Sequence, residues 1–393
     1  MNRSSHPPHS TDASKPVQQA RRRLIDRLFG WLMRRTDAEL CAPGNLPLHG
    51  IHRILVCRVN HRLGNNVLIS ATLRELETLY PGAEIDIASA GDSARALFAT
   101  RFQVNRVLYL SRRAVRHPWQ SLRWLRAIRA NTYDLAIDPC VHSHSGRMLL
   151  GLCKARFKVG FPYSENHPNA RHYRINRPNH MAKCGVFLIR TAYAGTTDMH
   201  WPQLDVKLDA DEWRQGRRAL QNLFHDGHAL DPDRPIIGVF PHASGNKRLA
   251  ESWWIAFVTA LQQQRPQWRL VNILAHHGQS QLPDSLPPIY SSDLRKLASV
   301  LGNVQGFISA DCGVMHLAAA VGAPTLGLFT RANLATYAPY GTGSRGIHVS
   351  LDAPATEVAR LAATWLDQIP ACMPPRAEAN TTWHRQPLAF TSP

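Results

Sequence analysis

The sequence contains little that would support a disulfide framework or a structural zinc site. Its seven cysteines are an odd number, are widely scattered and form no C-x-x-C pair. This spacing argues against a disulfide-stabilised fold and against the usual zinc sites. No apolar run reaches the roughly 18 residues that a membrane-spanning helix requires. The polar residues 1–16 also lack the apolar stretch of a signal peptide. We therefore expect a cytoplasmic protein.

Acidic residues are scarce as well. The chain has 28 Asp and Glu against 46 Lys and Arg, a formal charge of +18. Residues 101–130 contain eight arginines and no acid, and residues 147–190 contain nine basic residues and only Glu165 as an acid. A solubilising surface would intersperse acids, so this pattern indicates an anionic partner. The partner could be nucleic acid, an acidic membrane or a phosphorylated substrate. We expect no nucleic acid, because no basic and aromatic motif of the known binding modules is present.

The N-terminal extension has two parts. Residues 1–16 have a composition typical of disorder, whereas residues 21–35 predict a helix with arginines beside an apolar face. The apolar positions on that face are Leu24, Ile25, Leu28, Trp31 and Leu32. Such a helix suits an anionic membrane interface, with Trp31 at the level of the headgroups. The alternative is a helix docked on the surface of the protein itself, and the sequence favours neither.

Strands and helices alternate through the rest of the chain, which predicts an α/β fold with parallel sheets. In the first half, a loop over residues 60–66 should lead into a helix over 67–80. Predicted strands of both halves are short apolar runs at residues 54–59, 84–88, 104–110, 134–137, 235–240, 269–274, 306–309 and 325–329. Predicted helices of the second half begin near residue 209 and cover 253–264, 294–301 and 314–321.

This alternation divides the chain into two Rossmann-like domains. We expect an extension over residues 1–47, a first domain over 48–208, a second domain over 209–350, and a C-terminal helix and tail over 351–393. Ligands of open α/β sheets bind beyond the carboxyl ends of the strands. The predicted site is therefore a central cleft between two facing domains.

The most informative segment of the second domain follows the strand at 306–309. That strand leads to Asp311, a glycine stands at 313, and a helix begins. Unpaired N–H groups at a helix start form an anion site that suits a diphosphate. A bare pattern of this kind would also fit an ordinary turn with Asp311 as the helix cap.

The whole string over residues 311–325 resembles the D-[ST]-G-x-x-H-L-A-A-A-x-G-x-P signature of glycosyltransferase family 9, the lipopolysaccharide heptosyltransferases. Asp311, Gly313 and His316 match, whereas Cys312 stands where the family usually has Ser or Thr. The resemblance covers roughly residues 53–345. It implies the GT-B architecture of two Rossmann-like domains, and donor binding by Asp311, Cys312, Gly313 and His316.

A second resemblance lies at residues 239–248, where a predicted strand runs into a Ser/Gly loop. The loop resembles the family's H-P-G-A-S-x-x-x-K-R-W-P stretch, and Ser244, Lys247 and Arg248 match it. His242 replaces the usual glycine and Leu249 the tryptophan. The match implies donor binding, with Lys247 as a catalytic charge on the leaving diphosphate. The alternative is a solvated basic turn.

The third match follows the first strand and bears on catalysis. Gly64 and Asn65 stand where the family has L-G-D, whose Asp is taken to be the general base. The match implies that Gly64 contributes to donor binding. An amide cannot accept a proton at neutral pH, so Asn65 can orient a hydroxyl but cannot deprotonate it. Another group must then be the base, or activity is reduced. We consider Asp138, at the end of the strand at 134–137, and more weakly the histidines His61, His142 and His144. A capping or solvated role fits each of them equally well.

Two further patterns predict no metal. Asp209 and Asp211 have the D-x-D form, but they lie at a predicted helix start, where capping explains them. The histidine-rich spots at 142–144 and 276–277 lack partners at the spacing of a zinc site. We therefore expect neither a metal nor another cofactor.

The resemblance implies an inverting transferase that moves heptose from ADP-heptose to an anionic lipopolysaccharide precursor at the inner membrane. The basic first half fits such an acceptor. Residues 274–279 lack the Glu that the family uses near the donor, so another nucleotide sugar is an alternative. A catalytically weak scaffold that binds nucleotide or carbohydrate is the second alternative, and Asn65 is its main support.

Overall fold

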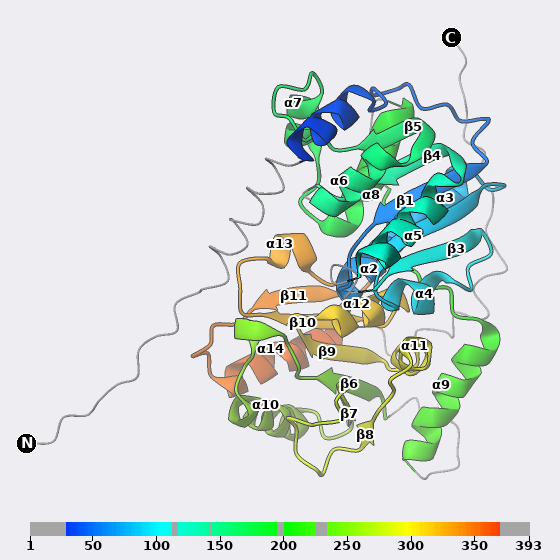
Figure 1. Ribbon diagram of the computed structural model, residues 1–393. Coiled ribbons are helices and arrows are strands. Elements are labelled where there is room, and N and C mark those ends of the chain that lie inside the picture. The colour runs from blue at the N-terminus through cyan, green and yellow to red at the C-terminus, as the bar shows by residue number, and fades with distance from the viewer. Residues whose placement is uncertain (1–28, 112–116, 142, 195–199, 225–233, 370–393) are drawn as a thin grey trace, which may run out of the picture.

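The structure is a computed structural model that describes residues 29–111, 117–141, 143–194, 200–224 and 234–369. Two parallel sheets follow one another along the chain, each with helices between its strands (Figure 1). The α/β class predicted from the alternation of apolar runs is confirmed.

The first sheet has five parallel strands in the order β3-β2-β1-β4-β5. Its strands are β1 (Arg53–Arg58), β2 (Glu84–Ala90), β3 (Val104–Leu110), β4 (Thr132–Asp138) and β5 (Lys154–Gly160). Its helices are α2 (Leu63–Leu68), α3 (Ser70–Leu79), α4 (Ser93–Phe98), α5 (Pro118–Arg129), α6 (His144–Leu152), α7 (Ala170–Asn176) and α8 (Met181–Ala194).

The second sheet has six parallel strands in the order β11-β10-β9-β6-β7-β8. Its strands are β6 (Ile236–Phe240), β7 (Arg269–Ile273), β8 (Pro288–Ile289), β9 (Gly306–Ala310), β10 (Thr325–Phe329) and β11 (Arg345–His348). Its helical segments are α9 (Ala210–Leu223), the 3₁₀ turn η2 (Gly245–Lys247), α10 (Glu251–Gln264), α11 (Leu294–Gly302), α12 (Gly313–Ala320), α13 (Leu334–Tyr337) and α14 (Ala355–Gln368).

Each sheet reverses its strand order at one point. In the first sheet the order reverses between β1 and β4, and in the second between β6 and β9. Loops that leave the carboxyl ends of such a pair diverge to opposite faces, which opens the place where doubly wound sheets bind ligands. The four strands that precede the predicted site residues are these four.

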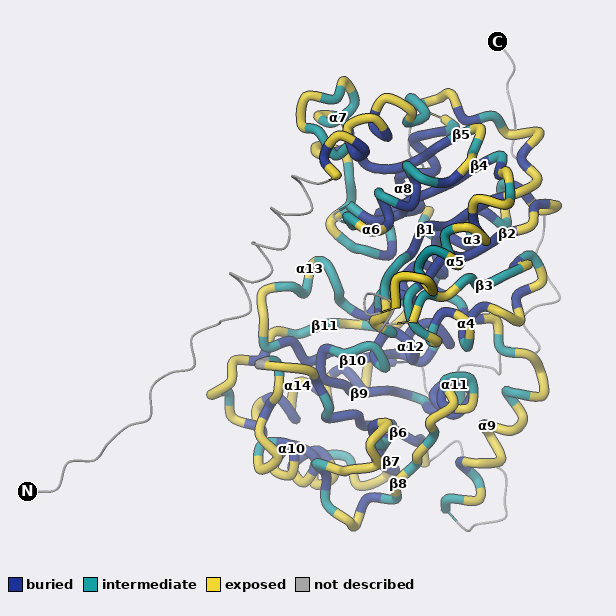
Figure 2. The backbone as a smooth tube through the Cα atoms, in the orientation of Figure 1, coloured by how far each residue is buried: buried dark blue, intermediate teal, exposed yellow. Residues whose placement is uncertain are grey.

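Strand residues alternate between two apolar layers. Ile54 and Val56 of β1 face one layer, and Leu55 and Cys57 face the other. A strand that is apolar on both faces is typical of a parallel sheet covered by helices on each side. Figure 2 shows the central strands of both sheets as buried, whereas α9 is largely exposed.

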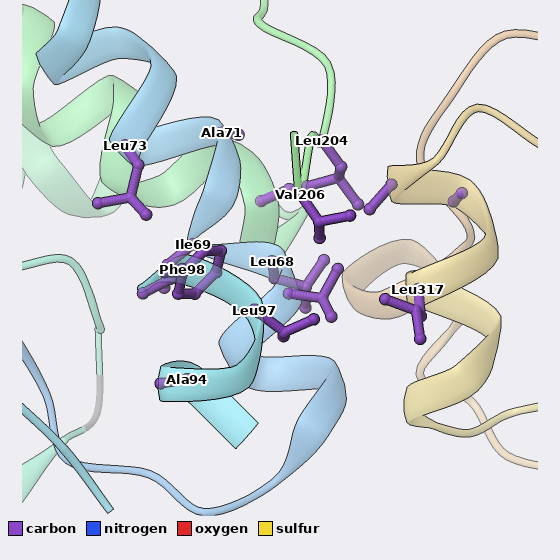
Figure 3. Close-up of a cluster of buried hydrophobic side chains, with 14 of the residues drawn as sticks. Leu68, Ile69, Ala71, Leu73, Ala94, Leu97, Phe98, Leu204, Val206 and Leu317 are labelled. Atoms are coloured by element: carbon purple, nitrogen blue, oxygen red, sulfur yellow. The ribbon is translucent and has the colours of Figure 1, made fainter. Parts of the chain in front are cut away.

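A continuous apolar cluster joins the two halves. Leu317 of α12 faces the side chains of Leu68 in α2 and Leu97 in α4, and the connecting segment adds Leu204 and Val206 (Figure 3). All five residues are nearly inaccessible to solvent. The contact between α2 and α12 is thus a packed part of the core.

One sequence prediction near the site is wrong. The loop expected over residues 60–66 is shorter, because α2 begins at Leu63 and a second helix, α3, follows from Ser70. Gly64 and Asn65 therefore lie in the first turn of a helix, where side-chain directions are fixed by the helical backbone. The sequence carries no signal for this helix start, because the N-cap residue is Arg62, which is not a capping residue and makes no side-chain cap hydrogen bond.

The described part of the N-terminal extension forms a helix over residues 29–38. Leu32 and Met33 are buried against the protein, while Phe29 and Trp31 are 36 % and 60 % exposed. The predicted apolar face is therefore divided, because Leu32 packs on the protein whereas Trp31 faces solvent. The helix is docked on the surface of the protein, which was the second alternative. Residues 24, 25 and 28 lie outside the described residues. Within the described residues, no helix combines the length and apolar character needed to cross a membrane.

Candidate active site

The two predicted donor segments meet at the carboxyl ends of β6 and β9. Lys247, in η2 after β6, donates from Nζ to Oδ2 of Asp311 at 2.6 Å. Asn333 donates from Nδ2 to the same oxygen at 2.9 Å. The Asp311 side chain is 7 % exposed and that of Lys247 25 %. The carboxylate therefore fixes a partly exposed ammonium group beside the start of α12.

The start of α12 follows a cysteine at the helix N-cap. Cys312 occupies the N-cap in an extended conformation, and its side chain makes no cap hydrogen bond. Its Sγ atom lies 3.4 Å from Oγ of Ser309. Burial raises the pKa of the thiol, so it stays protonated at neutral pH. Backbone N–H groups of a helix start and a lysine ammonium group are donors that bind diphosphates in proteins, and here Asp311 balances the charge of Lys247 in the described conformation.

The other residues of the β6 loop surround this pair. Ser244 precedes η2 and is exposed, and Gly245 adopts φ +67°, a conformation that favours glycine. The exposed Arg248 donates from Nε to the carbonyl of Ala243 at 2.9 Å. His242, an unexpected residue in this loop, contacts the carbonyl of Gln279 through Nε2 at 3.0 Å. The loop is thus held by one internal hydrogen bond and by a contact with the segment after β7, while Ser244 stays open to solvent.

Two glycines bring the domains into contact. A Cβ atom on Gly313 would lie 2.8 Å from the backbone N of Gly64, and a Cβ on Gly64 would lie 2.8 Å from Cδ2 of His316. Contacts that short do not occur, so α2 and α12 can pack this closely only because both positions lack side chains. This places the first turn of α2, including Asn65, directly against the start of α12.

His316 is an internal residue. It is 3 % exposed, and burial lowers its pKa to about 4, so the imidazole is neutral at pH 7. Its Nδ1 atom has no hydrogen-bond partner among the described residues. A neutral ring beneath Gly64 packs the domain junction and adds no positive charge to the anion site.

The Asn65 side chain is half-buried on the first turn of α2. Its backbone carbonyl accepts from Nε of Arg58 at 3.3 Å, and Arg58 also contacts the thiol of Cys140. Arg58 and Cys140 lie at the carboxyl ends of β1 and β4, the reversal point of the first sheet. Sequence analysis missed Arg58, although its place at the end of a strand was a usable signal.

The alternative bases lie in different surroundings. Asp138 ends β4, is fully buried, and accepts from the backbone N of Cys140 at 3.2 Å. Burial raises its pKa to about 7, against the opposing effect of the Arg147 guanidinium. An acceptor hydroxyl cannot touch this carboxyl in the described conformation. His61 is exposed, His144 lines a pocket, and His142 lies outside the described residues.

That pocket has a volume of about 490 Å³ and lies beyond the carboxyl ends of β4 and β5. We call it the arginine pocket, because Arg147, Arg171, Arg174 and Arg177 line it while Glu165 is its one acid. The sequence indicated the basic excess over residues 147–190 but could not show that α6 and α7 bring it together.

The D-x-D pattern is a helix cap, as predicted. Asp209 accepts from the backbone N of Glu212 at 2.8 Å, and the Glu212 carboxylate accepts from the backbone N of Asp209 at 2.8 Å. This reciprocal capping box uses the side chains of Asp209 and Glu212. Across the described ranges, no three His, Cys, Asp or Glu residues are grouped so that they could hold a metal ion.

The fold is that of a two-domain α/β protein, with the Lys247–Asp311 ion pair and the start of α12 at the junction between the domains. The model of the family described as "Glycosyltransferase family 9 (heptosyltransferase)" matches residues 121–360, more than half of the chain. The chain therefore belongs to glycosyltransferase family 9, and it is a glycosyltransferase. The family predicted from residues 311–325 is confirmed.

Solved structures of similar fold agree. A family 9 glycosyltransferase from Veillonella parvula superposes with a TM-score of 0.61 at 16 % identity, covering 81 % of this chain and 98 % of the other. E. coli heptosyltransferase WaaC with ADP superposes with a TM-score of 0.57 at 16 % identity, covering 81 % of this chain and 100 % of the other. E. coli ADP-heptose LPS heptosyltransferase II superposes with a TM-score of 0.55 at 18 % identity, covering 81 % of this chain and 99 % of the other. These likenesses establish the GT-B fold. No curated protein sequence matches the chain.

Proposed function

We propose that this glycosyltransferase transfers heptose from ADP-heptose, with inversion, to a lipopolysaccharide core acceptor at the cytoplasmic face of the inner membrane. The observation that carries the proposal is the Lys247–Asp311 ion pair beside the open start of α12, packed against the turn that holds Asn65. The structures of E. coli WaaC named for ADP and for ADP-2-deoxy-2-fluoro heptose support the choice of donor.

The geometry suits an in-line displacement. The diphosphate lies on the α12 N–H groups and Lys247, which stabilise the negative charge that develops as the glycosidic bond breaks. The acceptor hydroxyl approaches from the first domain, where the first turn of α2 faces α12. Lys247 supplies the positive charge that a metal ion supplies in other transferases, so we propose that the reaction needs no metal or other cofactor.

Donor choice is the first prediction. Isothermal calorimetry in the presence of EDTA should detect ADP binding to the full chain, and UDP and GDP should bind at least about tenfold more weakly, a difference of about 1.4 kcal/mol. The physical reason is that all three share the diphosphate and differ in the base, so only base contacts can discriminate. Tight UDP or GDP binding without ADP binding would exclude ADP-heptose and favour another nucleotide sugar. ADP binding that requires added magnesium would contradict the metal-free mechanism.

A catalytically weak scaffold is the second candidate, and Asn65 favours it. The amide at this position cannot take the acceptor proton, and the buried Asp138 does not reach the surface. The anion site would still bind nucleotide, so binding and turnover must be measured separately to distinguish the candidates.

Membrane contact is the remaining part of the proposal. The helix over residues 29–38 exposes Phe29 and Trp31 beside the exposed Arg34 and Arg35. Trp31, Arg34 and Arg35 are three and four residues apart and share one exposed face of this helix, whereas Phe29 lies on the side of the buried Leu32 and Met33. An aromatic and basic face suits peripheral binding to anionic lipid. The acceptor of the proposed reaction is itself anchored in such a membrane.

The Trp31→Ala variant should bind vesicles of phosphatidylcholine and phosphatidylglycerol about fivefold more weakly than the unmodified chain, since about 1 kcal/mol of apolar burial is lost. Co-sedimentation with the vesicles measures this. Leu351→Ala is the matched control, because Leu351 is 63 % exposed on the second domain. Equal binding of all three proteins would show that the helix does not contact the membrane.

A further inference from the structure

The arginine pocket has a wall that comes from outside the first sheet. Helices α6 and α7 and the segment after β5 line most of it, and Met33 of the helix over residues 29–38 completes it. Figure 1 shows this helix, in dark blue, beside α7. Gly151 of α6 permits the close approach, because a Cβ atom there would lie 2.3 Å from Oγ1 of Thr36.

Asp37 locks this wall in place. Its buried carboxylate accepts from the backbone N of Tyr163 at 2.9 and 3.0 Å, from that of Ser164 at 2.7 Å, and from Nη1 of Arg147 at 2.8 Å. The Arg147–Asp37 pair is 6 % and 5 % exposed at its side chains. A buried carboxylate with three donors is rigid, because each lost hydrogen bond would leave a charge unsatisfied. The pocket is thus preformed.

Arg147 is the buried cation of the lining, and its guanidinium group is held by Asp37 through Nη1. Exposed Arg171 and Arg174 on α7 add two cations on the same lining, and Arg177 a third. Asp37 balances the charge of Arg147, so the excess of the lining comes from Arg171, Arg174 and Arg177 against the single carboxylate of Glu165.

The pocket is connected to the domain junction through named contacts. Cys140 lines the pocket and contacts Arg58, and Arg58 donates to the Asn65 carbonyl on the turn that packs against α12. Two side chains, Cys140 and Arg58, therefore link the pocket to the turn that carries Asn65, within the domain that the proposed function assigns to the acceptor.

We propose that the arginine pocket binds a compact oxyanion of the acceptor, a phosphate monoester or a carboxylate, and that the helix over residues 29–38 is the structural wall of this site. The inference rests on the proposed function for the identity of the acceptor. Guanidinium groups bind both oxyanions through paired N–H donors. The group held here is not the one that reacts; it fixes the position of the sugar that carries the nucleophilic hydroxyl.

The test uses the double variant Arg171→Gln/Arg174→Gln. Both side chains are exposed, and glutamine preserves the helix, so the fold should be retained. Calorimetric titration of inorganic phosphate is performed with saturating ADP, which occupies the donor site. The double variant should bind phosphate roughly tenfold more weakly than the unmodified chain. The control is Arg360→Gln, which removes an exposed arginine from α14 outside the pocket and should leave phosphate affinity unchanged.

The ADP titration on the same samples separates the two proposals. If ADP binds all three proteins equally and phosphate affinity is also equal, the pocket proposal is overturned and the donor proposal stands. If ADP fails to bind but the double variant loses phosphate affinity, the donor proposal fails and the oxyanion site stands.

Two further titrations identify the source of the oxyanion. Acetate replaces phosphate to test a carboxylate, and phosphatidylcholine vesicles with and without phosphatidic acid test a phosphate carried by lipid. Loss of the preference for phosphatidic acid vesicles in the double variant assigns the phosphate to a lipid-borne headgroup. A loss confined to free phosphate or acetate assigns the site to a soluble part of the acceptor.

Discussion

The Asn65→Asp variant is expected to transfer sugar about 100-fold faster than the unmodified chain, within the range that a positioned general base contributes. The half-buried Asn65 lies on the first turn of α2, against the start of α12. An aspartate there would gain a proton acceptor at the junction of the two domains. The helix start and the nearby Arg58 guanidinium, which already donates to the residue 65 carbonyl, would keep the new carboxylate ionised at neutral pH.

The gain should appear in kcat, while KM for the donor remains nearly constant, because the proposed diphosphate contacts, Lys247 and the start of α12, lie in the other domain. Asn65→Ala is the matched control: it removes the amide without adding a base and should not exceed the unmodified chain. A fall of Asn65→Asp to the level of Asn65→Ala would contradict the prediction. It would mean that the amide orients the acceptor and that another residue, such as His144 in the arginine pocket, is the base.

The fold was predictable where a single physical rule determines an element. The strand over 104–110 matches β3 at both ends, because its valines and its tyrosine favour a half-buried pleated strand. The cap at Asp209 was predictable because Asp followed by Glu three residues later satisfies two backbone donors. The weakly apolar strands β5, β8 and β11 were not predicted, since they obtain their burial or pairing only from neighbours in the sheet.

The site was predictable only in part, for the same reason. Residues 311–316 and Lys247 were found through local motifs, and the structure brings Lys247 and Asp311 together. Asn333, which shares the Asp311 carboxylate, gave no local signal because it lies 22 residues further along the chain. The burial of Asp138 and the assembly of four arginines around one pocket depend on tertiary packing. Neither could be read from spacing.

Lys247→Ala should lower kcat by a factor of about 100 to 1,000, or about 2.7–4 kcal/mol, as for the loss of a preorganised group that stabilises developing charge. Lys247 is the cation that Asp311 fixes at 2.6 Å beside the start of α12. The leaving diphosphate gains negative charge only as the bond to the sugar breaks, so the interaction is strongest in the transition state. The loss should therefore exceed any change in KM.

Two variants make this measurement specific. Lys247→Arg keeps the charge but not the shape of the ammonium group, and should recover part of the lost rate. Lys296→Ala removes an exposed lysine from α11 in the same domain and should leave kcat unchanged. Thermal unfolding of each variant checks that Asp311, which retains Asn333 as a donor, does not destabilise the loop. A kcat for Lys247→Ala close to that of the unmodified chain would mean that the α12 N–H groups alone stabilise the diphosphate.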